Sequence, residues 1–104
     1  YEHIVRGQIF HWQKSYAKAS EAFTEAAKVR LEQKGGNDPL LGRVYYFHGL
    51  AKKGSGEDQQ ALELFKKALA IQIKSPGPES YRTVETQAAL AALKAKKKKS
   101  RTEP

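Results

Sequence analysis

The sequence repeats itself with a period of 42 residues. Four positions of small or aromatic type recur in one register, which pairs Gly7 with Gly49, Ala19 with Ala61, Phe23 with Phe65 and Ala26 with Ala68. A fixed internal period of this size is typical of a chain built from stacked supersecondary units. A single helix pair cannot bury its own apolar face, whereas stacked pairs form one continuous core. The repeat therefore predicts the architecture before any single helix is assigned.

Apolar residues recur at helical rather than alternating spacing through most of the chain. The pattern predicts helices over about 1–13, 16–33, 40–53 and 57–74, and a fifth that begins near residue 79 or 80. Both repeated glycines fall in the middle of a predicted helix, where glycine costs up to about 1 kcal/mol relative to alanine. A glycine at such a place usually lets another segment come close. We therefore expect the two repeated phenylalanines to fill the spaces between the helices.

The segments between the predicted helices hold residues that favour helix ends. Ser15 is expected to cap the second helix through its hydroxyl. Gly35 suits a left-handed cap after that helix, and Pro39 fits the first turn of the third. Ser55 followed by Asp58 resembles a capping box for the fourth.

The fifth predicted helix is rich in alanine, which makes it intrinsically strong. We expect its apolar side to hold alanines together with Val84, Leu90 and Leu93. Ala91 stands 42 residues after Gly49, so this helix keeps the register of the repeat. No further helix is predicted after it.

This pattern resembles the tetratricopeptide repeat, in which two helices are joined by a short turn. The first helix of each pair carries a glycine, and the second carries Ala, Phe and Ala. In the first unit the resemblance rests on Gly7, Phe10, the Lys14-Ser15-Tyr16 corner, Ala19, Phe23 and Ala26, and in the second on Tyr45, Gly49, the Gly56 corner, Ala61, Phe65 and Ala68. It implies an all-α fold, a right-handed superhelical stack of antiparallel helix pairs. The period exceeds the usual ~34 residues and is similar to the longer repeats of kinesin light chain.

The resemblance also divides the chain. It implies a repeat domain over 1–93, with repeat one at about 1–34, repeat two at about 40–75 and a capping helix from about 79; a basic tail over 94–104 follows. One departure is Lys52, which occupies a position where the family usually has an aromatic side chain and where Phe10 stands in repeat one.

Composition argues against most catalytic chemistry. The 104 residues include no cysteine, which fits a reducing compartment, and we expect the protein in the cytoplasm or nucleus. The three histidines lack the spacing of a metal site, and no nucleophile or phosphate-binding motif is complete. No apolar run is long enough to span a membrane. The chain starts at Tyr1 without methionine, which indicates a fragment or a processed product. We predict a protein that is not an enzyme, with no cofactor and no bound metal.

The resemblance implies that the first helix of each repeat lines a concave groove that holds a partner peptide or helix. The groove residues are then Ile4, Val5, Gln8, Trp12, Arg43, Tyr46, Phe47 and Leu50. Some of them are alternatively core residues, but Tyr45 and Tyr46 point about 100° apart and cannot both face inward. A subset of the family binds acidic chaperone C-terminal tails through a basic clamp; the matching places here hold Ile4, Gln8, Phe47, Glu85 and Ala89, so we expect no such binding. Tyr46→Ala and Phe47→Ala are expected to weaken the partner complex without unfolding the domain.

The net charge of +8 is concentrated at one end, because residues 94–104 carry +5 of it. Lys96, Lys97, Lys98, Lys99 and Arg101 have three interpretations: a solvated helix end, a nuclear localisation signal, or a contact to nucleic acid or an anionic membrane. The sequence as a whole favours a protein-interaction module. The alternatives are a nucleic-acid-associated or nuclear-targeted domain that acts through the tail, and a structural end-piece of a longer solenoid.

Overall fold

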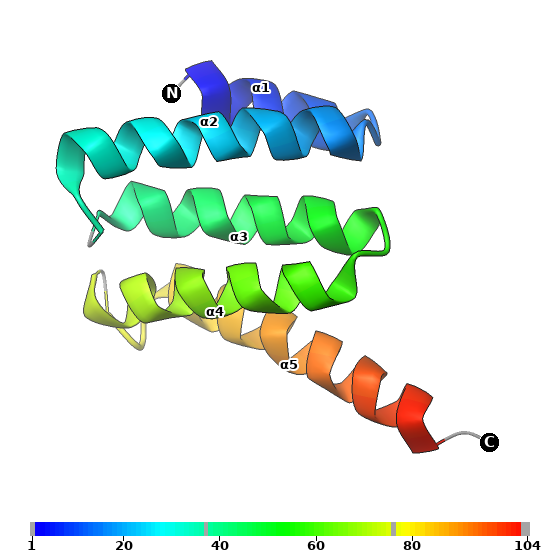
Figure 1. Cartoon of the computed structure of the whole chain (residues 1–104). Coiled ribbons are helices and arrows are strands. Elements are labelled where there is room, and N and C mark those ends of the chain that lie inside the picture. Colours follow the sequence, from blue (N-terminus) through cyan, green and yellow to red (C-terminus); the bar gives the residue numbers. More distant parts are fainter. Residues whose placement is uncertain (1, 37, 76, 103–104) are drawn as a thin grey trace.

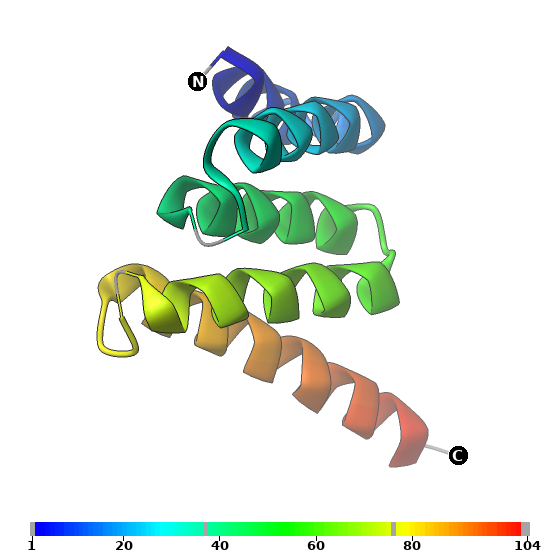
Figure 2. The same ribbon diagram turned by 60° about the vertical axis from the view of Figure 1, so that its left-hand side comes forward.

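The computed structural model describes the backbone of residues 2–36, 38–75 and 77–102, and the side chains of 4, 6–36, 38–75 and 77–96. Within these residues five α-helices follow one another: α1 (Glu2–Trp12), α2 (Tyr16–Lys34), α3 (Pro39–Gly54), α4 (Asp58–Lys74) and α5 (Tyr81–Thr102) (Figure 1). Each helix packs against the next along the chain, and α1 also contacts α3. Figure 2 shows them as one file of hairpins with α1 and α5 at opposite ends. The all-α class is confirmed, whereas the right-handed superhelix stays a prediction.

The repeated glycines bring the two helices of each pair together. A Cβ placed on Gly7 would lie 2.6 Å from Cε1 of Phe23, and a Cβ placed on Gly49 would lie 2.6 Å from Cε1 of Phe65. Real Cβ atoms essentially never come that close to another heavy atom. Both rings are completely buried. The expected close approach at these glycines is therefore confirmed.

The core consists of two clusters. The first joins α1, α2, α3 and the end of α4 through Ile4, Ala19, Phe23, Ala26, Ala27, Leu41, Val44, Ala51 and Ile71. The second joins α4 and α5 through Ala61, Leu62, Phe65, Leu90 and Leu93. Side chains of α3 pack against both clusters, because Phe47 touches the first while Tyr46 and Leu50 touch the second.

The helix ends agree with the sequence patterns only in part. Pro39 begins α3, as predicted. Gly35 follows α2 with the expected positive φ of 79°, but its ψ of −174° lies outside the left-handed helical region, so the predicted left-handed cap is confirmed only in the sign of φ. The predicted cap by Ser15 is wrong, since its side chain makes no cap bond. The capping box is also wrong: the N-cap of α4 is Glu57, and the Ser55 Oγ lies 2.9 Å from the Lys52 carbonyl oxygen.

The structure corrects the predicted apolar side of α5. Leu90 and Leu93 are buried as predicted, but Val84 is 50% exposed, and Thr83 and Thr86 are buried instead. Thr83 can be buried because its Oγ1 lies 3.1 Å from the Gln72 carbonyl oxygen and 2.6 Å from that of Gly77. Burying a threonine whose hydroxyl has such partners costs little, because a buried polar group is expensive only when it lacks a hydrogen bond.

The basic segment continues α5 as far as Thr102 rather than leaving the helix. Lys96 forms an exposed ion pair with Asp58, with 3.2 Å between Nζ and Oδ2. Such a pair contributes at most about 1 kcal/mol. The side chains of Lys97, Lys98, Lys99 and Arg101 lie outside the described residues, so the three interpretations of the tail stay open.

Candidate partner-binding face

The side of the array formed by α1, α3 and α5 carries most of the predicted groove residues. We call it the first-helix face and define it by Gln8 of α1, Arg43, Tyr46, Phe47 and Leu50 of α3, and Glu85 and Ala89 of α5. All seven are half-buried, so each exposes part of its side chain. Arg43, Phe47 and Leu50 follow one another at the i, i+4 and i+7 spacing that places side chains on one side of a helix.

The remaining predicted groove residues do not share this situation. Ile4 is only 7% exposed and belongs to the first core cluster, so it supports the face from below. Trp12 is 77% exposed at the end of α1. The Val5 side chain lies outside the described residues. The groove assignment as a whole stays a prediction.

The aromatic residues of α3 connect the surface with the core beneath. The rings of Phe47 and Phe23 are stacked with an angle of 18° and a centroid distance of 6.1 Å. Tyr46 lies between the Phe47 and Phe65 rings, at 5.6 and 5.8 Å. The Arg43 guanidinium lies over the Phe47 ring, with its Cζ 5.6 Å from the centroid. Phe47 thus has one side on the core and another beneath a cation.

The Glu85 carboxylate of α5 lies beside the Tyr46 hydroxyl of α3 on this face. The Tyr46 hydroxyl donates to the Glu85 carboxylate, and burial together with the charge of Glu85 raises the pKa of Tyr46 to about 12. Tyr81 donates to the same carboxylate, which raises the Tyr81 pKa. Glu85 is therefore a fixed negative charge that accepts from two tyrosines.

These contacts change what simple truncations would report. Tyr46 and Phe47 are packed against the two core clusters, so their replacement by alanine would remove core contacts as well as surface. Truncating large buried side chains usually costs several kcal/mol. Both variants are therefore expected to lose stability as well as binding, and side chains with less core contact give a clearer test of binding.

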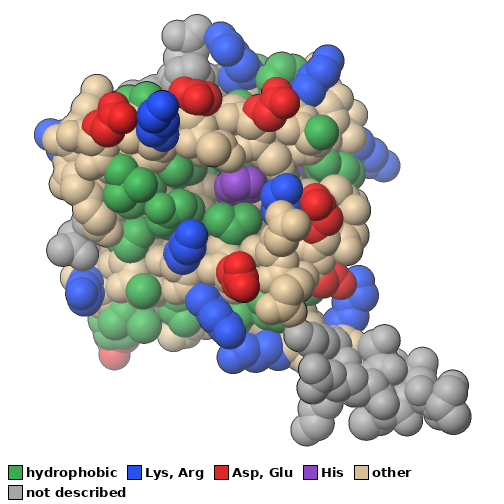
Figure 3. Space-filling view, viewed as in Figure 1, with side chains coloured by type: hydrophobic (Ala, Val, Ile, Leu, Met, Phe, Trp, Pro, Cys, Tyr) green, Lys and Arg blue, Asp and Glu red, His purple; other side chains and the backbone are tan. Residues whose placement is uncertain are grey.

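Apart from the first-helix face, the structure has a depression of about 820 Å³ between α2 and the α3–α4 corner. Figure 3 shows it as a hollow with histidine atoms at its floor. Most of its lining residues are of polar type, namely Ser20, Glu21, Thr24, Glu25, His48, Lys52, Ser55, Glu57 and Gln60, and Ala17 completes the lining. We call it the His48 depression. Among the described residues, no group of three or more His, Asp or Glu is arranged to hold a metal ion.

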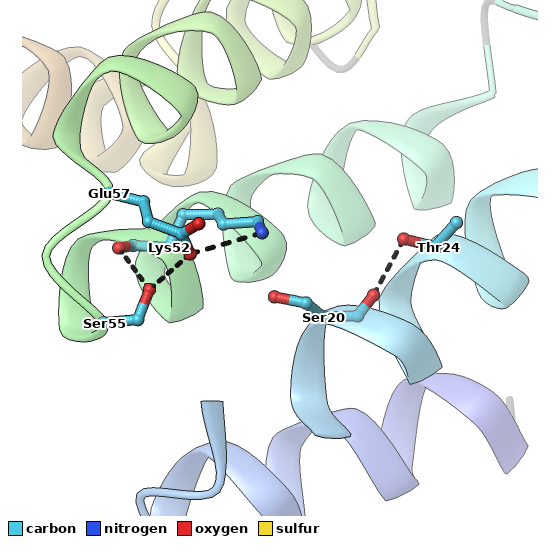
Figure 4. A network of polar contacts seen from close by, with 5 residues as sticks. All are labelled: Ser20, Thr24, Lys52, Ser55 and Glu57. Carbon is cyan, nitrogen blue, oxygen red and sulfur yellow. Dashed lines mark hydrogen bonds and ion pairs between the residues drawn. The ribbon is translucent and has the colours of Figure 1, made fainter. Parts of the chain in front are cut away.

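A short polar network forms one wall of the His48 depression (Figure 4). Glu57 Oε2 accepts from the Ser55 hydroxyl at 2.7 Å and from Lys52 Nζ at 3.3 Å. On the opposite wall, the Thr24 hydroxyl donates to the Ser20 carbonyl oxygen at 2.8 Å. The two bonds to Glu57 keep the side chains of Lys52 and Glu57 at the α3–α4 corner.

Sequence reasoning missed this depression, although one signal pointed to it. Lys52 takes the place that Phe10 has in repeat one, and its ammonium group faces the polar depression instead of a core. A smaller hollow at α1 and α2 is lined by Arg6, Phe10 and Lys18, which are the 42-residue counterparts of His48, Lys52 and Gln60. The same position of the repeat is therefore polar in one unit and partly apolar in the other.

His48 makes the fold sensitive to acid. Burial lowers its pKa to about 4, and the nearby charges of Lys52 and Lys67 act in the same direction. The ordinary pKa of a histidine is about 6.5, so the unfolded chain binds a proton more readily than the folded chain between these values. Stability is therefore fully present above about pH 6.5 and falls as the pH approaches 4.

Between pH 7.5 and pH 4.5 we expect the free energy of unfolding to fall by about 1–2 kcal/mol less in His48→Gln than in the parent. This value is reduced for the partial exposure of the ring. The measurement is urea unfolding of the parent and the variant at pH 7.5 and pH 4.5. Ser20→Ala removes a neighbouring polar side chain that does not titrate, so it should keep the parent's pH dependence. An equal loss of stability on acidification in the parent and in His48→Gln would contradict the assignment.

Comparison with known proteins agrees with the fold. No helix among the described residues is long and apolar enough to cross a membrane. No curated protein and no solved structure matches the chain. The resemblance to the long repeats of kinesin light chain therefore stays a prediction. A family model described as tetratricopeptide repeat matches residues 3–74, which include α3, α4 and nearly all of the first helix pair. The chain therefore belongs to the tetratricopeptide repeat family.

Proposed function

We propose that the first-helix face binds an extended or helical segment of another protein. Tetratricopeptide repeats are in general protein-interaction modules that act as non-catalytic scaffolds. The observation that supports this face in particular is the Arg43–Phe47 pair, a cation over a half-buried aromatic ring beside Leu50. Aromatic and arginine side chains that are partly desolvated are the usual centres of binding energy in interfaces.

The charges of the face limit which segments fit. Arg43 is the one basic member of the face as we define it, and Glu85 is the one acidic member. An apolar segment with few charges would cover Phe47 and Leu50 without burying an unpaired ion. An acidic chaperone tail would approach the fixed negative charge of Glu85, while the clamp positions hold Ile4, Gln8, Phe47 and Ala89 beside it. We therefore propose that such tails are not its partners.

The test is a peptide selection followed by binding measurements. Peptides are selected against the immobilised chain from a displayed library, and the best one is titrated by calorimetry. We expect the double variant Gln8→Ala/Arg43→Ala to weaken binding about tenfold or more, because each interfacial contact of this kind is worth about 1 kcal/mol or more. Lys66→Ala, an exposed change on α4, serves as the matched control.

Two outcomes would contradict the proposal. If the double variant Gln8→Ala/Arg43→Ala binds the selected peptide as tightly as the parent and Lys66→Ala do, the first-helix face is not the site. If only Lys52→Ala weakens binding, the His48 depression is the site instead. Tight binding of an acidic chaperone-tail peptide would overturn the predicted exclusion of such tails.

A further inference from the structure

One surface of α5 has the register of a helix-packing surface, and no helix of the described residues lies on it. In the first repeat Gly7 lies beneath Phe23 of α2, and in the second Gly49 lies beneath Phe65 of α4. The next position in this register, Ala91, is exposed. The described part of the chain places no helix over it, and Figure 2 shows α5 at the end of the file with α4 on its inner side.

The equivalent surface of α3 shows what such a surface covers. A Cβ on Gly42 would lie 3.1 Å from the Gln72 side chain of α4, and Tyr46 lies 5.8 Å from the Phe65 ring. Together with Gly49, these residues form the surface on which α4 packs. Their counterparts 42 residues later are Val84, Ala88 and Ala91, all exposed and all apolar. We call these three residues, with the exposed Tyr81 at the start of the helix, the outer face of α5.

Charge indicates which helix fits. Lys94 is exposed and is the counterpart of Lys52, whose ammonium group is paired at 3.3 Å with Glu57 at the N-terminus of α4. A helix that runs antiparallel to α5, as α4 does to α3, would begin beside Lys94. An acidic first turn there would meet both the lysine and its own helix dipole favourably.

A second copy of the chain is a poor occupant. Each copy carries a net charge of +8, so two copies repel each other. The helices that carry the packing phenylalanines also bury them completely within their own repeats. The occupant must therefore bring its own large apolar side chain, which must lie slightly farther out than Phe65 does because Ala91 has a Cβ where Gly49 has none.

We propose that the outer face of α5 binds an amphipathic helix of a partner protein. The helix runs antiparallel to α5, places a large apolar or aromatic side chain against Ala91, and begins with an acidic turn beside Lys94. This site shares no residue with the first-helix face, although Tyr81 contacts Glu85 of that face, and so either proposal can fail without the other.

The chain itself supplies a probe. A synthetic peptide of residues 57–74 contains the acidic start of α4 and Phe65, and it is the helix that packs on the equivalent surface of α3. Glu63 and Lys67 are exposed in α4 and stand four residues apart, so a lactam between them pre-forms the helix. The lactam uses the Lys67 ammonium group, which lies over the Tyr45 ring of α3, but the counterpart of Tyr45 in α5 is Gln87, so no such contact is lost on the outer face. Pre-forming the helix reduces the ordering cost of binding.

The peptide is titrated into the isotope-labelled full chain and followed by NMR. We expect saturable chemical-shift changes at residues 84, 88 and 91. The peptide should bind the Ala91→Lys chain at least tenfold more weakly than the parent, and a peptide with Phe65→Ala should bind the parent at least tenfold more weakly than the unchanged peptide. Ala70→Lys makes the same change at an exposed alanine of α4 and should bind like the parent. Lys94→Glu should weaken binding several-fold, and a peptide with Glu57→Lys and Asp58→Lys should restore it.

Three results would overturn the proposal. The first is no saturable binding at about millimolar peptide concentration. The second is binding that Ala91→Lys leaves unchanged. The third is self-association of the parent that Ala91→Lys abolishes in sedimentation experiments, because the occupant would then be a second copy.

Discussion

Replacing Gly49 by leucine is expected to destabilise the fold by about 3 kcal/mol or more. A Cβ at this position already falls 2.6 Å from the Phe65 ring, and leucine adds three further carbons. The ring cannot move away, because it is completely buried beneath the second core cluster. Overpacking in a filled core usually costs about 1–3 kcal/mol and more when the backbone must separate. For a domain of this size, we expect the midpoint of thermal unfolding to fall by more than about 10 °C.

The control for this substitution is Gly36→Leu, because a Cβ on Gly36 meets nothing within 4 Å. It should change the midpoint by only a few degrees. Combining Gly49→Leu with Phe65→Leu gives the new side chain some of the space of the ring, so the double variant should lose less stability than the sum of the two single variants. A Gly49→Leu variant that unfolds at the parent's temperature would show that α3 and α4 do not approach closely at this glycine.

The parts of the fold that follow from the repeat could be predicted from the sequence. Gly7 with Phe23 and Gly49 with Phe65 recur in one register, and a shared register fixes which side of each helix faces its partner. Glycine inside a helix has few physical reasons to be there other than close approach, so the packing at these positions was predictable. The helix ends were predictable to within a few residues because glycine, proline and serine mark the segments between the helices.

The orientation of α5 was not predictable from apolar pattern alone. Val84 is the more hydrophobic residue, yet Thr83 is buried because its hydroxyl meets two carbonyl oxygens, that of Gln72 in the last turn of α4 and that of Gly77 after it. That geometry depends on how residues 75–80 fold, which no local rule specifies. The serines at the corners gave a similar error, since Ser55 bonds to Lys52 and Glu57 rather than capping α4.

The candidate sites show the same division. Arg43 and Phe47 could be assigned to one surface from helical spacing, and the structure places them in contact. The burial of Ile4 and the exposure of Trp12 depend instead on where α2 and α3 cross α1, which the pattern of α1 does not contain. The His48 depression is formed by side chains from α2, α3 and α4 together, which no single helix pattern predicts. Its one signal in the sequence was Lys52, a lysine at a position where the family usually has an aromatic side chain.

Phe23 connects the first repeat with the second, because its ring packs against Phe47 of α3. Its ring is fully buried beneath Gly7, stacked on Phe47, and 6.2 Å from the His48 ring. We expect Phe23→Ala to cost about 3–5 kcal/mol, because the cavity cannot be filled by the alanines around it. Phe23→Leu keeps most of the volume and should cost roughly a third of that.

The loss should be uneven along the chain, because each unit of a repeat array contacts only its neighbours. Hydrogen exchange measured by mass spectrometry should accelerate most in α1 and α2, less in α3, and least in α4 and α5, whose cluster around Phe65 is untouched. An equal acceleration in all five helices would contradict this picture. The cavity would also admit water beside His48 and bring its pKa back toward the ordinary value. Phe23→Ala should therefore lose stability at neutral pH while becoming less sensitive to acid than the parent.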